Sequence, residues 1–340
     1  MEHMTRVGAS RPFQMLRFGP WAIGAMLMTA VLVNASDYSF LVPLREVRVA
    51  SHQQVVAHSA PAPARYRLLV PMVLDVPIRF LSTVMPYDKA FGRVYAVFHF
   101  AALLTLLAML VYELSRWFTL EQAMVGALLV GSTIRLALRQ GEYMDLSSIP
   151  LTGVFAPHSL LEPIFVAGTV VLALTKNTWW ITALLVLATL NSEASAFLPL
   201  VYLAVRGISA QSLKATIGLA TIWMAISVAI RLVVGTSEPA LIPGEMWRDN
   251  LAHLPTTVIN VGLFIGPLWL LAALGMKRAP EPVRRASLLI PIYMGAVAIA
   301  GLWWDVRLLM GLYPILIPLV LAALFAPRPA PAERHAGAVT

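Results

Sequence analysis

The sequence predicts an all-α integral membrane protein with about 10 transmembrane helices, each of which needs about 20 mainly apolar residues. Of the 340 residues, 59% are hydrophobic and 12% are charged, whereas soluble domains carry about 25% charged residues. Apolar runs long enough to cross a bilayer recur along the whole chain. Composition and run length therefore indicate a single polytopic helical domain, which we assign to residues 19–326.

The net charge of +8 and the isoelectric point near 10.0 have a membrane explanation. Lys and Arg accumulate at the cytoplasmic ends of transmembrane helices, where they meet anionic lipid. No nucleic-acid-binding motif accompanies the positive charge, so membrane lipid rather than nucleic acid is the expected partner. The chain contains no cysteine, which excludes a thiol nucleophile and cysteine-ligated zinc.

The N-terminus has the charge pattern of an uncleaved first span. Residues 1–18 carry three arginines and form the predicted cytoplasmic N-terminal segment. The apolar run at 21–33 follows them, as in a signal peptide, but the small residues near Ala35 match a cleavage site poorly. We therefore expect the first transmembrane helix at residues 19–34.

A large first extracytoplasmic loop is predicted at residues 34–89, which include the longest polar interruption in the N-terminal half. Within it, residues 68–86 are apolar on average but carry Asp75 and Arg79. A charge in the middle of a span costs about 2.5–3.5 kcal/mol on insertion scales. We therefore expect this segment to form an interfacial helix along the membrane surface.

The apolar stretch 178–206 does not fit a single span. As one helix it would be about 43 Å long, too long for a hydrocarbon core of about 30 Å without strong tilt. Asn191, Ser192 and Glu193 interrupt it, so we expect two half-spans that meet at a polar apex.

A disordered cytoplasmic tail is expected at 327–340. The other expected spans are 90–112, 120–138, 158–175, 213–234, 257–276, 286–303 and 306–326.

Basic residues set the expected orientation, because they are enriched in cytoplasmic loops. One short loop holds four of them and marks the cytoplasmic side. These four are Lys277, Arg278, Arg284 and Arg285. With 178–206 as a hairpin, both termini are cytoplasmic, and the outward loops are 34–89, 139–157, 235–256 and 304–307. If 68–86 instead spans the membrane and 178–206 is one helix, the helices between these two segments have the opposite orientation in the membrane.

Two carboxylates that follow the first span are candidates for catalysis. Asp37 and Glu46 lie just outside the expected membrane boundary, and Asp37 is the closer of the two. A carboxylate there can take a proton from an acceptor hydroxyl or bind a divalent metal ion. The sequence leaves the metal requirement open, and a solvated loop without a chemical role is the alternative interpretation.

The triplet Arg65, Tyr66 and Arg67 opens the expected interfacial segment and is a candidate for substrate binding. Two guanidiniums can hold a lipid phosphate, because arginine meets phosphate with two hydrogen bonds. A belt of Tyr and Arg that only anchors the segment at the membrane surface would have the same composition.

A second polar cluster lies farther along the chain. Arg135 and Arg139 are four residues apart and share one helix face, and Asp145 follows shortly after them. These residues suit the wall of a substrate-binding site, although a salt-bridge cluster that caps the helix would give the same pattern.

His158 and Glu162 begin the next span, where a capped helix start is a simpler interpretation than a metal site.

Glu193, with Asn191 beside it, is the most informative polar residue of the predicted bundle. Placing an ionisable side chain inside an apolar run costs free energy, so such a residue usually lines a cavity or pathway, although it can also make a structural hydrogen bond.

Asp305 and Arg307 open the last span and predict a mutually neutralised pair at the outer mouth of a substrate site. A GxxxG pattern at 262–266 predicts close helix packing.

Three segments carry a resemblance to known proteins: ARYRLLVPMV after the first loop, LNSEASAFLPLVYL in the middle and WWDVRLLMGLYPILIP at the end. They resemble segments of bacterial polytopic proteins of envelope-polysaccharide pathways, which in turn resemble the C-type glycosyltransferase fold. Members of that fold take sugars from polyprenyl-phosphate carriers outside the membrane, and their large first loop supplies an acidic catalytic residue. The resemblance gives that role to Asp37, or otherwise to Glu46.

The resemblance and the polar clusters together predict a glycosyltransferase of the bacterial inner membrane. It would use a polyprenyl-phosphate-linked sugar, with arginines neutralising the leaving phosphate and Glu193 orienting the acceptor or a cationic partner. A secondary transporter or lipid flippase that uses Glu193, and an assembly subunit without a site, are the alternatives. The sequence also leaves open a homo-oligomer or a pathway partner.

Overall fold

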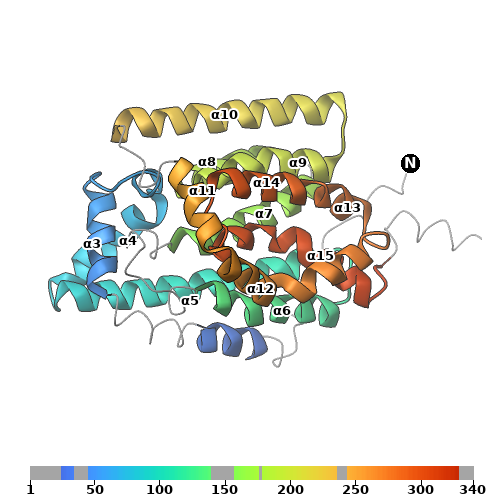
Figure 1. Ribbon diagram of the computed structural model, residues 1–340, viewed down its shortest axis with the longest axis horizontal. Coiled ribbons are helices and arrows are strands. Elements are labelled where there is room, and N and C mark those ends of the chain that lie inside the picture. Colours follow the sequence, from blue (N-terminus) through green and yellow to red (C-terminus); the bar gives the residue numbers. More distant parts are fainter. Residues whose placement is uncertain (1–23, 34–44, 139–156, 176–177, 236–242, 329–340) are drawn as a thin grey trace, which may run out of the picture.

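The structure is a computed structural model, in which the regular elements are α-helices and short 3₁₀ helices (Figure 1). The all-α class is therefore confirmed for the part of the chain that the structure describes. That part comprises residues 24–33, 45–138, 157–175, 178–235 and 243–328.

The N-terminal half places short helices before two longer ones. An apolar helix at Gly24–Val33 comes first. The helices that follow are α3 (Arg45–Val56), η2 (Ala64–Tyr66), α4 (Leu69–Ser82), α5 (Tyr87–Leu114) and α6 (Leu120–Leu138).

The C-terminal half alternates longer helices with short interruptions. Its first elements are η6 (Pro157–Leu160), α7 (Leu161–Thr175), α8 (Thr178–Asn191), η7 (Glu193–Phe197), α9 (Leu198–Arg206) and α10 (Ala210–Val234). Its remaining elements are α11 (Pro243–Ala252), α12 (Leu254–Gly275), α13 (Glu281–Ser287), α14 (Leu289–Ala300), η8 (Val306–Leu312) and α15 (Tyr313–Leu324).

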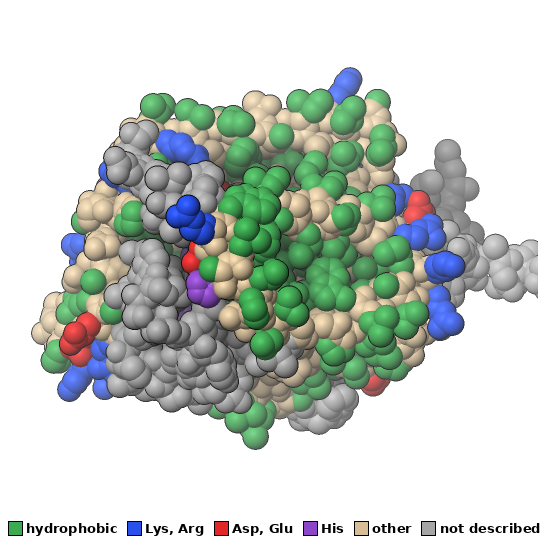
Figure 2. Space-filling model, viewed as in Figure 1, with side chains coloured by type: hydrophobic (Ala, Val, Ile, Leu, Met, Phe, Trp, Pro, Cys, Tyr) green, Lys and Arg blue, Asp and Glu red, His purple; other side chains and the backbone are tan. Residues whose placement is uncertain are grey.

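The longer helices run along the longest axis of the molecule, with α5 toward the lower edge of the view and α10 at the upper edge (Figure 1). Residues 313–322 of α15 are all buried, and this helix packs along α12 and against α6 and α7. Hydrophobic side chains cover the middle of the visible face, and most Lys and Arg lie toward the two ends (Figure 2). This distribution is that of a membrane-embedded helical protein.

The number of spans is smaller than expected in the described ranges. Five helices are long and apolar enough to cross a membrane, or six if the bent pair Leu254–Gly262 and Phe264–Gly275 forms one span. The prediction of about 10 spans is not confirmed, because several apolar runs form helices shorter than the bilayer core. With 14 residues, α8 is only about 21 Å long.

The stretch 178–206 is interrupted where the sequence predicts it. α8 ends at Asn191, η7 begins at Glu193, and α9 follows at Leu198. Ser192 between them has extended backbone angles (φ −164°, ψ 149°), which stops the helix. Both α8 and α9 pack on α7 and on α10, so two short helices take the place of one long span.

The segment 68–86 forms α4, a helix of 14 residues at the left end of the bundle beside α3 (Figure 1). At about 21 Å it is too short to cross a core of about 30 Å. One face packs on α5 through Val70, Leu74 and Ile78. Large apolar side chains on and just after α4 are exposed instead, namely Met72, Val73, Val76, Phe80 and Val84.

Close helix packing occurs at a different glycine from those predicted. A Cβ added at Gly262 or Gly266 would meet no atom within 4 Å, so the GxxxG pattern makes no tight contact in the described structure. At Gly275, by contrast, a Cβ would collide with the carbonyl oxygen of Leu319, because the end of α12 lies directly against α15. The absence of a side chain at Gly275 therefore permits this helix pair.

The basic loop after α12 is anchored by one of its own arginines. Arg285 donates hydrogen bonds to the carbonyl oxygens of Ala204 (3.0 Å) and Val205 (2.8 Å), at the end of α9. Gly207, with φ +80°, turns the chain close to this guanidinium. The other basic residues of the loop, Lys277, Arg278 and Arg284, are exposed.

Candidate functional site

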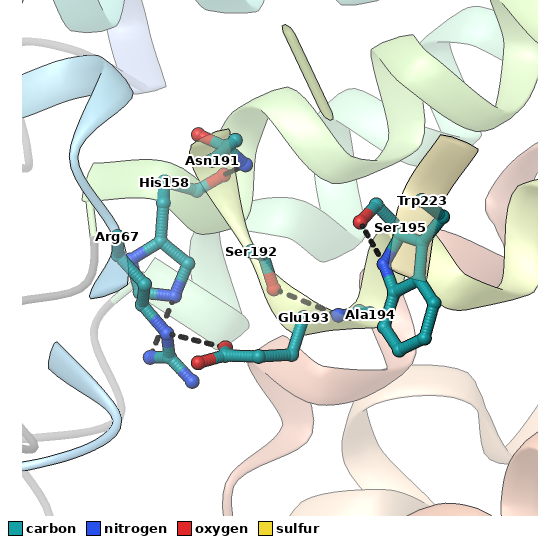
Figure 3. Close-up of polar contacts among 8 residues, drawn as sticks. All are labelled: Arg67, His158, Asn191, Ser192, Glu193, Ala194, Ser195 and Trp223. Atoms are coloured by element: carbon teal, nitrogen blue, oxygen red, sulfur yellow. Dashed lines mark hydrogen bonds and ion pairs between the residues drawn. The ribbon is translucent and has the colours of Figure 1, made fainter. Parts of the chain in front are cut away.

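Arg67 joins two distant parts of the chain, at the break between α8 and α9 (Figure 3). Its Nε lies 3.4 Å from a carboxylate oxygen of Glu193, and its Nη1 lies 2.9 Å from Nε2 of His158. Because a guanidinium only donates, Nε2 of His158 accepts this hydrogen bond and carries no proton. The side chains of Arg67 and Glu193 are 25% and 33% exposed, so both are within reach of a ligand.

The break between α8 and α9 holds Glu193 in position. Oγ of Ser192 accepts a hydrogen bond from the backbone N–H of Ala194 (3.2 Å), which caps the first turn of η7. Nε1 of Trp223 on α10 donates to Oγ of Ser195 at 3.0 Å (Figure 3). Glu193 is therefore presented by a turn that is tied to a separate helix.

Asn191 fixes the loop that carries His158. Its Nδ2 donates to the carbonyl oxygen of His158 at 3.0 Å, which joins the end of α8 to η6. Asn191 is only 1% exposed, and its Oδ1 has no hydrogen-bond partner within the described ranges. This residue therefore positions the site and leaves one buried acceptor atom unsatisfied.

Glu162 is a second carboxylate of the same cluster. It follows His158 by one helical turn at the start of α7. Ser192 is its polar neighbour, and Arg67, Glu193 and Asp305 are its charged neighbours. The sequence suggests only a capped helix start here, because the elements that bring these charges together are far apart along the chain.

A small cavity lies against Glu162. Its volume of about 20 Å³ holds about one water molecule. Its wall is almost entirely apolar, although Glu162, Asn191 and Ser192 are among the lining residues. Phe165, Val166, Ala188, Leu198 and Tyr293 also line it.

Asp305 and Arg307 form the pair that the sequence predicts. Two parallel contacts of 2.7 Å join Nε to Oδ1 and Nη2 to Oδ2. Asp305 also caps η8 by accepting a hydrogen bond from the backbone N–H of Arg307 (3.1 Å). The helix η8, which carries Arg307, packs against η6 and α7, which carry His158 and Glu162, so this pair is part of the same cluster.

The turn before this pair is held by α11. Nε1 of Trp304 donates to a carboxylate oxygen of Asp249 at 3.1 Å. Nδ2 of Asn250 donates to the carbonyl oxygen of Gly301 (3.0 Å), and its Oδ1 accepts from the backbone N–H of Trp303 (2.8 Å). The polar residues of α11 thus anchor one wall of the site.

Two members of the arginine triplet have anchoring contacts. Nη2 of Arg65 donates to the carbonyl oxygen of Val234 at 2.6 Å, at the end of α10. The guanidinium of Arg231 lies over the ring of Tyr66, 4.9 Å from its centroid. Within the triplet, Arg67 is thus the residue that contacts Glu193.

The remaining predicted residues are not joined to this cluster in the described structure. Glu46 is exposed in the first turn of α3. Arg135 lies in α6, where only its backbone is described. Asp37, Arg139 and Asp145 lie outside the described residues.

A separate polar network links α3, α4 and α5. Nδ1 of His52 lies 3.0 Å from the hydroxyl oxygen of Tyr95, and its Nε2 lies 3.4 Å from Asp75, which also pairs with Arg79. Burial lowers the pKa of His52, and the hydrogen bond to Asp75 opposes this effect. Because His52 and Tyr95 are fully buried, the network stabilises the packing of three helices.

The fold and the cluster define a class: a membrane-embedded helical protein with a group of ionisable residues around the break between α8 and α9. The group comprises Arg67, His158, Glu162, Glu193, Asp305 and Arg307. No protein-family model, curated protein or solved structure matches the chain. Within the described ranges, no group of three or more His, Asp or Glu residues is arranged to hold a metal ion.

Proposed function

We propose that the chain is a membrane glycosyltransferase that transfers a sugar from a polyprenyl-phosphate donor to an envelope glycan or lipid acceptor. The observation that carries this proposal is the contact of Arg67 with Glu193 and His158. It joins a guanidinium, which can bind phosphate, to a carboxylate inside a membrane-embedded bundle. A second guanidinium, that of Arg307, belongs to the same cluster.

In such a transfer, an acceptor oxygen bonds to the anomeric carbon of the sugar while the bond from that carbon to the phosphate oxygen breaks. A carboxylate takes the acceptor proton, and a cation neutralises the charge that the phosphate gains. Arg67 suits the second role, because its guanidinium can exchange its present partners for two hydrogen bonds to phosphate. Glu193 and Glu162 are neighbouring carboxylates, and Asp37 remains the base that the resemblance implies.

The surface of α4 supports a lipid substrate. Its exposed apolar side chains begin at Met72, five residues after Arg67, and extend to Phe80, over about 12 Å of helix. A short helix with an outward apolar face suits the boundary between lipid headgroups and acyl chains. We therefore assign α4 to the membrane surface, with a lipid chain against its outward face and the lipid phosphate at Arg67.

The distribution of basic residues supports an outward-facing site. Lys277, Arg278 and Arg284 are exposed on and beside α13, at the opposite end of the view from α3 and α4 (Figure 1). Basic loops stay in the cytoplasm. The proposal therefore has the Arg67 cluster at the extracytoplasmic end, in a bacterial inner membrane, with both termini cytoplasmic.

The proposal is tested by deleting the gene in its native cell and analysing envelope glycans and polyprenyl-linked sugars by mass spectrometry. We expect wild type and the matched control Arg278→Ala to restore the glycan. Arg67→Ala and Glu193→Gln, at equal protein levels in the membrane, should lower the product at least about tenfold, because each removes a group that contacts substrate. Full product from both variants would exclude this mechanism.

The competing class is a secondary transporter or lipid flippase. In that class Glu193 would bind the coupling ion or the solute, and no covalent product would form. Reconstituted vesicles whose solute or lipid flux is lost in Glu193→Gln, together with unchanged glycans in the deletion strain, would assign the chain to that class instead.

A further inference from the structure

Arg231 on α10 lies beside the residue that precedes Arg67. Its guanidinium lies over the ring of Tyr66 in η2, 4.9 Å from the ring centroid. Arg67, directly after Tyr66, contacts Glu193 at the start of η7. Both η2 and η7 pack against α10. Arg231 is therefore a second guanidinium in the surroundings of the contact between Arg67 and Glu193.

The side chain of Arg231 is directed back along α10, away from the C-terminal end of this helix. Its Nη1 donates to the carbonyl oxygen of Ser227 at 3.1 Å, one turn toward the N-terminus. Trp223, one further turn back, donates to Ser195 of η7 at 3.0 Å. Arginines that only anchor a helix end extend toward the lipid headgroups. The guanidinium of Arg231 is instead directed toward the part of α10 that holds η7.

Arg231 has hydrogen-bonding capacity for a ligand. Within the described ranges, its hydrogen bond to Ser227 uses one of the five N–H groups that a guanidinium has. The residue is exposed, and among the described residues it forms no ion pair with a carboxylate. An anion can therefore bind here without displacing an ion pair that the described structure contains.

The charge of Arg67, by contrast, is already compensated. Glu193 is its ion-pair partner, and Glu162 is a second carboxylate close enough to interact with it electrostatically. A phosphate that approached Arg67 alone would therefore meet two carboxylates beside one guanidinium, and like charges repel. A second cation offsets this repulsion, and Arg231 is a guanidinium that contacts η2 from α10.

We propose that Arg231 and Arg67 together, the two-arginine site, bind the phosphate group of a lipid-linked substrate. A phosphate accepts paired hydrogen bonds from one guanidinium and has further oxygens for a second one. The exposed apolar face of α4 begins at Met72, five residues after Arg67, and offers a surface for the lipid chain. That the phosphate carries a sugar rests on the proposed function.

Binding can be measured without transfer of a sugar. Purified protein in nanodiscs of phosphatidylcholine, a lipid without net charge, is titrated with geranylgeranyl phosphate or with geranylgeraniol. The two ligands have the same chain and differ in the phosphate. We expect the phosphate to bind at least about tenfold more tightly, because its hydrogen bonds from arginine are charge-assisted.

Variants of Arg231 locate the effect. Arg231→Gln removes the charge, keeps an N–H donor for Ser227, and should weaken binding of geranylgeranyl phosphate at least about tenfold while leaving binding of geranylgeraniol unchanged. A purely structural role of Arg231 would weaken both ligands equally and overturn the proposal. If Arg231→Gln does not fold, Arg231→Lys should weaken the phosphate alone, because lysine lacks the paired donors. The exposed control Arg278→Gln should leave both affinities unchanged.

Competition identifies the source of the phosphate. An excess of inorganic phosphate, or phosphatidylglycerol added to the nanodisc, should change the affinity for geranylgeranyl phosphate by less than about threefold. Displacement by inorganic phosphate would assign the site to a free anion, and displacement by phosphatidylglycerol would assign it to bulk lipid. Either result, or wild-type affinity in Arg231→Gln, would overturn the two-arginine site for a lipid-linked substrate.

The two-arginine site and the glycosyltransferase proposal can fail separately. Phosphate binding that depends on Arg231, in a protein whose deletion leaves glycans unchanged, would support the two-arginine site and reject the transferase. Lost glycan in Arg67→Ala, with wild-type binding of geranylgeranyl phosphate in Arg231→Gln, would support the transferase and reject the two-arginine site.

Discussion

Arg67 lies 3.4 Å from Glu193, although the two residues are 126 positions apart in the sequence. The contact ties the turn before α4 to the break between α8 and α9. Through His158 it also reaches the start of α7. The candidate site therefore exists only when these three segments have packed together, which links its chemistry to the stability of the bundle.

Replacing Arg67 with lysine separates charge from geometry. A lysine keeps the positive charge but has one nitrogen, so it cannot reproduce the separate contacts of Nε and Nη1 with Glu193 and His158. We expect the free energy of unfolding in detergent to fall by about 1–2 kcal/mol. The exposed control Arg278→Lys should change it by less than about 0.5 kcal/mol. Equal effects of the two substitutions would contradict the structure.

Gly275→Ala tests the contact between α12 and α15. The new Cβ would collide with the backbone at Leu319, which cannot move away as a side chain can. We expect a loss of about 1–3 kcal/mol in the free energy of unfolding. Gly262→Ala is the matched control, because its Cβ meets open space and alanine favours the helix by about 1 kcal/mol. A neutral result at Gly275 would argue against this helix pair.

The pH dependence of stability should contain a contribution from His52. Its folded pKa is lowered from 6.5 by burial, so below about pH 6.5 the unfolded chain takes up a proton before the folded protein does. Stability contributed by His52 is therefore constant above that pH and decreases as the pH falls toward the folded pKa. Thermal midpoints of wild type and His52→Gln, measured from about pH 7.5 to about pH 5, should reveal the difference. Parallel curves would contradict this assignment.

Trp223→Phe tests whether α10 positions Glu193. Phenylalanine retains most of the ring but removes the Nε1–H that donates to Ser195. We expect a small stability loss of about 1 kcal/mol together with a several-fold loss of the glycan product, because η7 loses its hydrogen bond to α10. A stability change with an unaltered amount of glycan would show that this hydrogen bond is structural only.

Single cysteines can determine the orientation, because the natural chain has none. Lys89 is exposed at the start of α5, and Lys277 is exposed after α12. In intact cells, a membrane-impermeant maleimide should label Lys89→Cys directly and Lys277→Cys only after permeabilisation. The reverse pattern would put the Arg67 cluster in the cytoplasm and remove the proposed extracytoplasmic reaction.

Some parts of the site could be predicted because they depend on neighbours in sequence. The Asp305–Arg307 pair joins residues two apart, and the break at Asn191–Glu193 follows from polar residues inside an apolar run. Arg67 and Glu193 could be selected separately as unusual charges, but no local pattern shows that they meet. No local pattern identifies Glu162 either, because its charged neighbours Arg67, Glu193 and Asp305 come from three other segments.

The sequence by itself determined the helical class and the membrane environment, because both depend on the local density of apolar side chains. Only the tertiary structure decided which arginine of the triplet reaches a carboxylate, which glycine lies under a neighbouring helix and how many helices are long enough to cross the bilayer. Those features depend on distances between segments that hydropathy does not encode. Packing, rather than composition, therefore brings Arg67, His158 and Glu193 together.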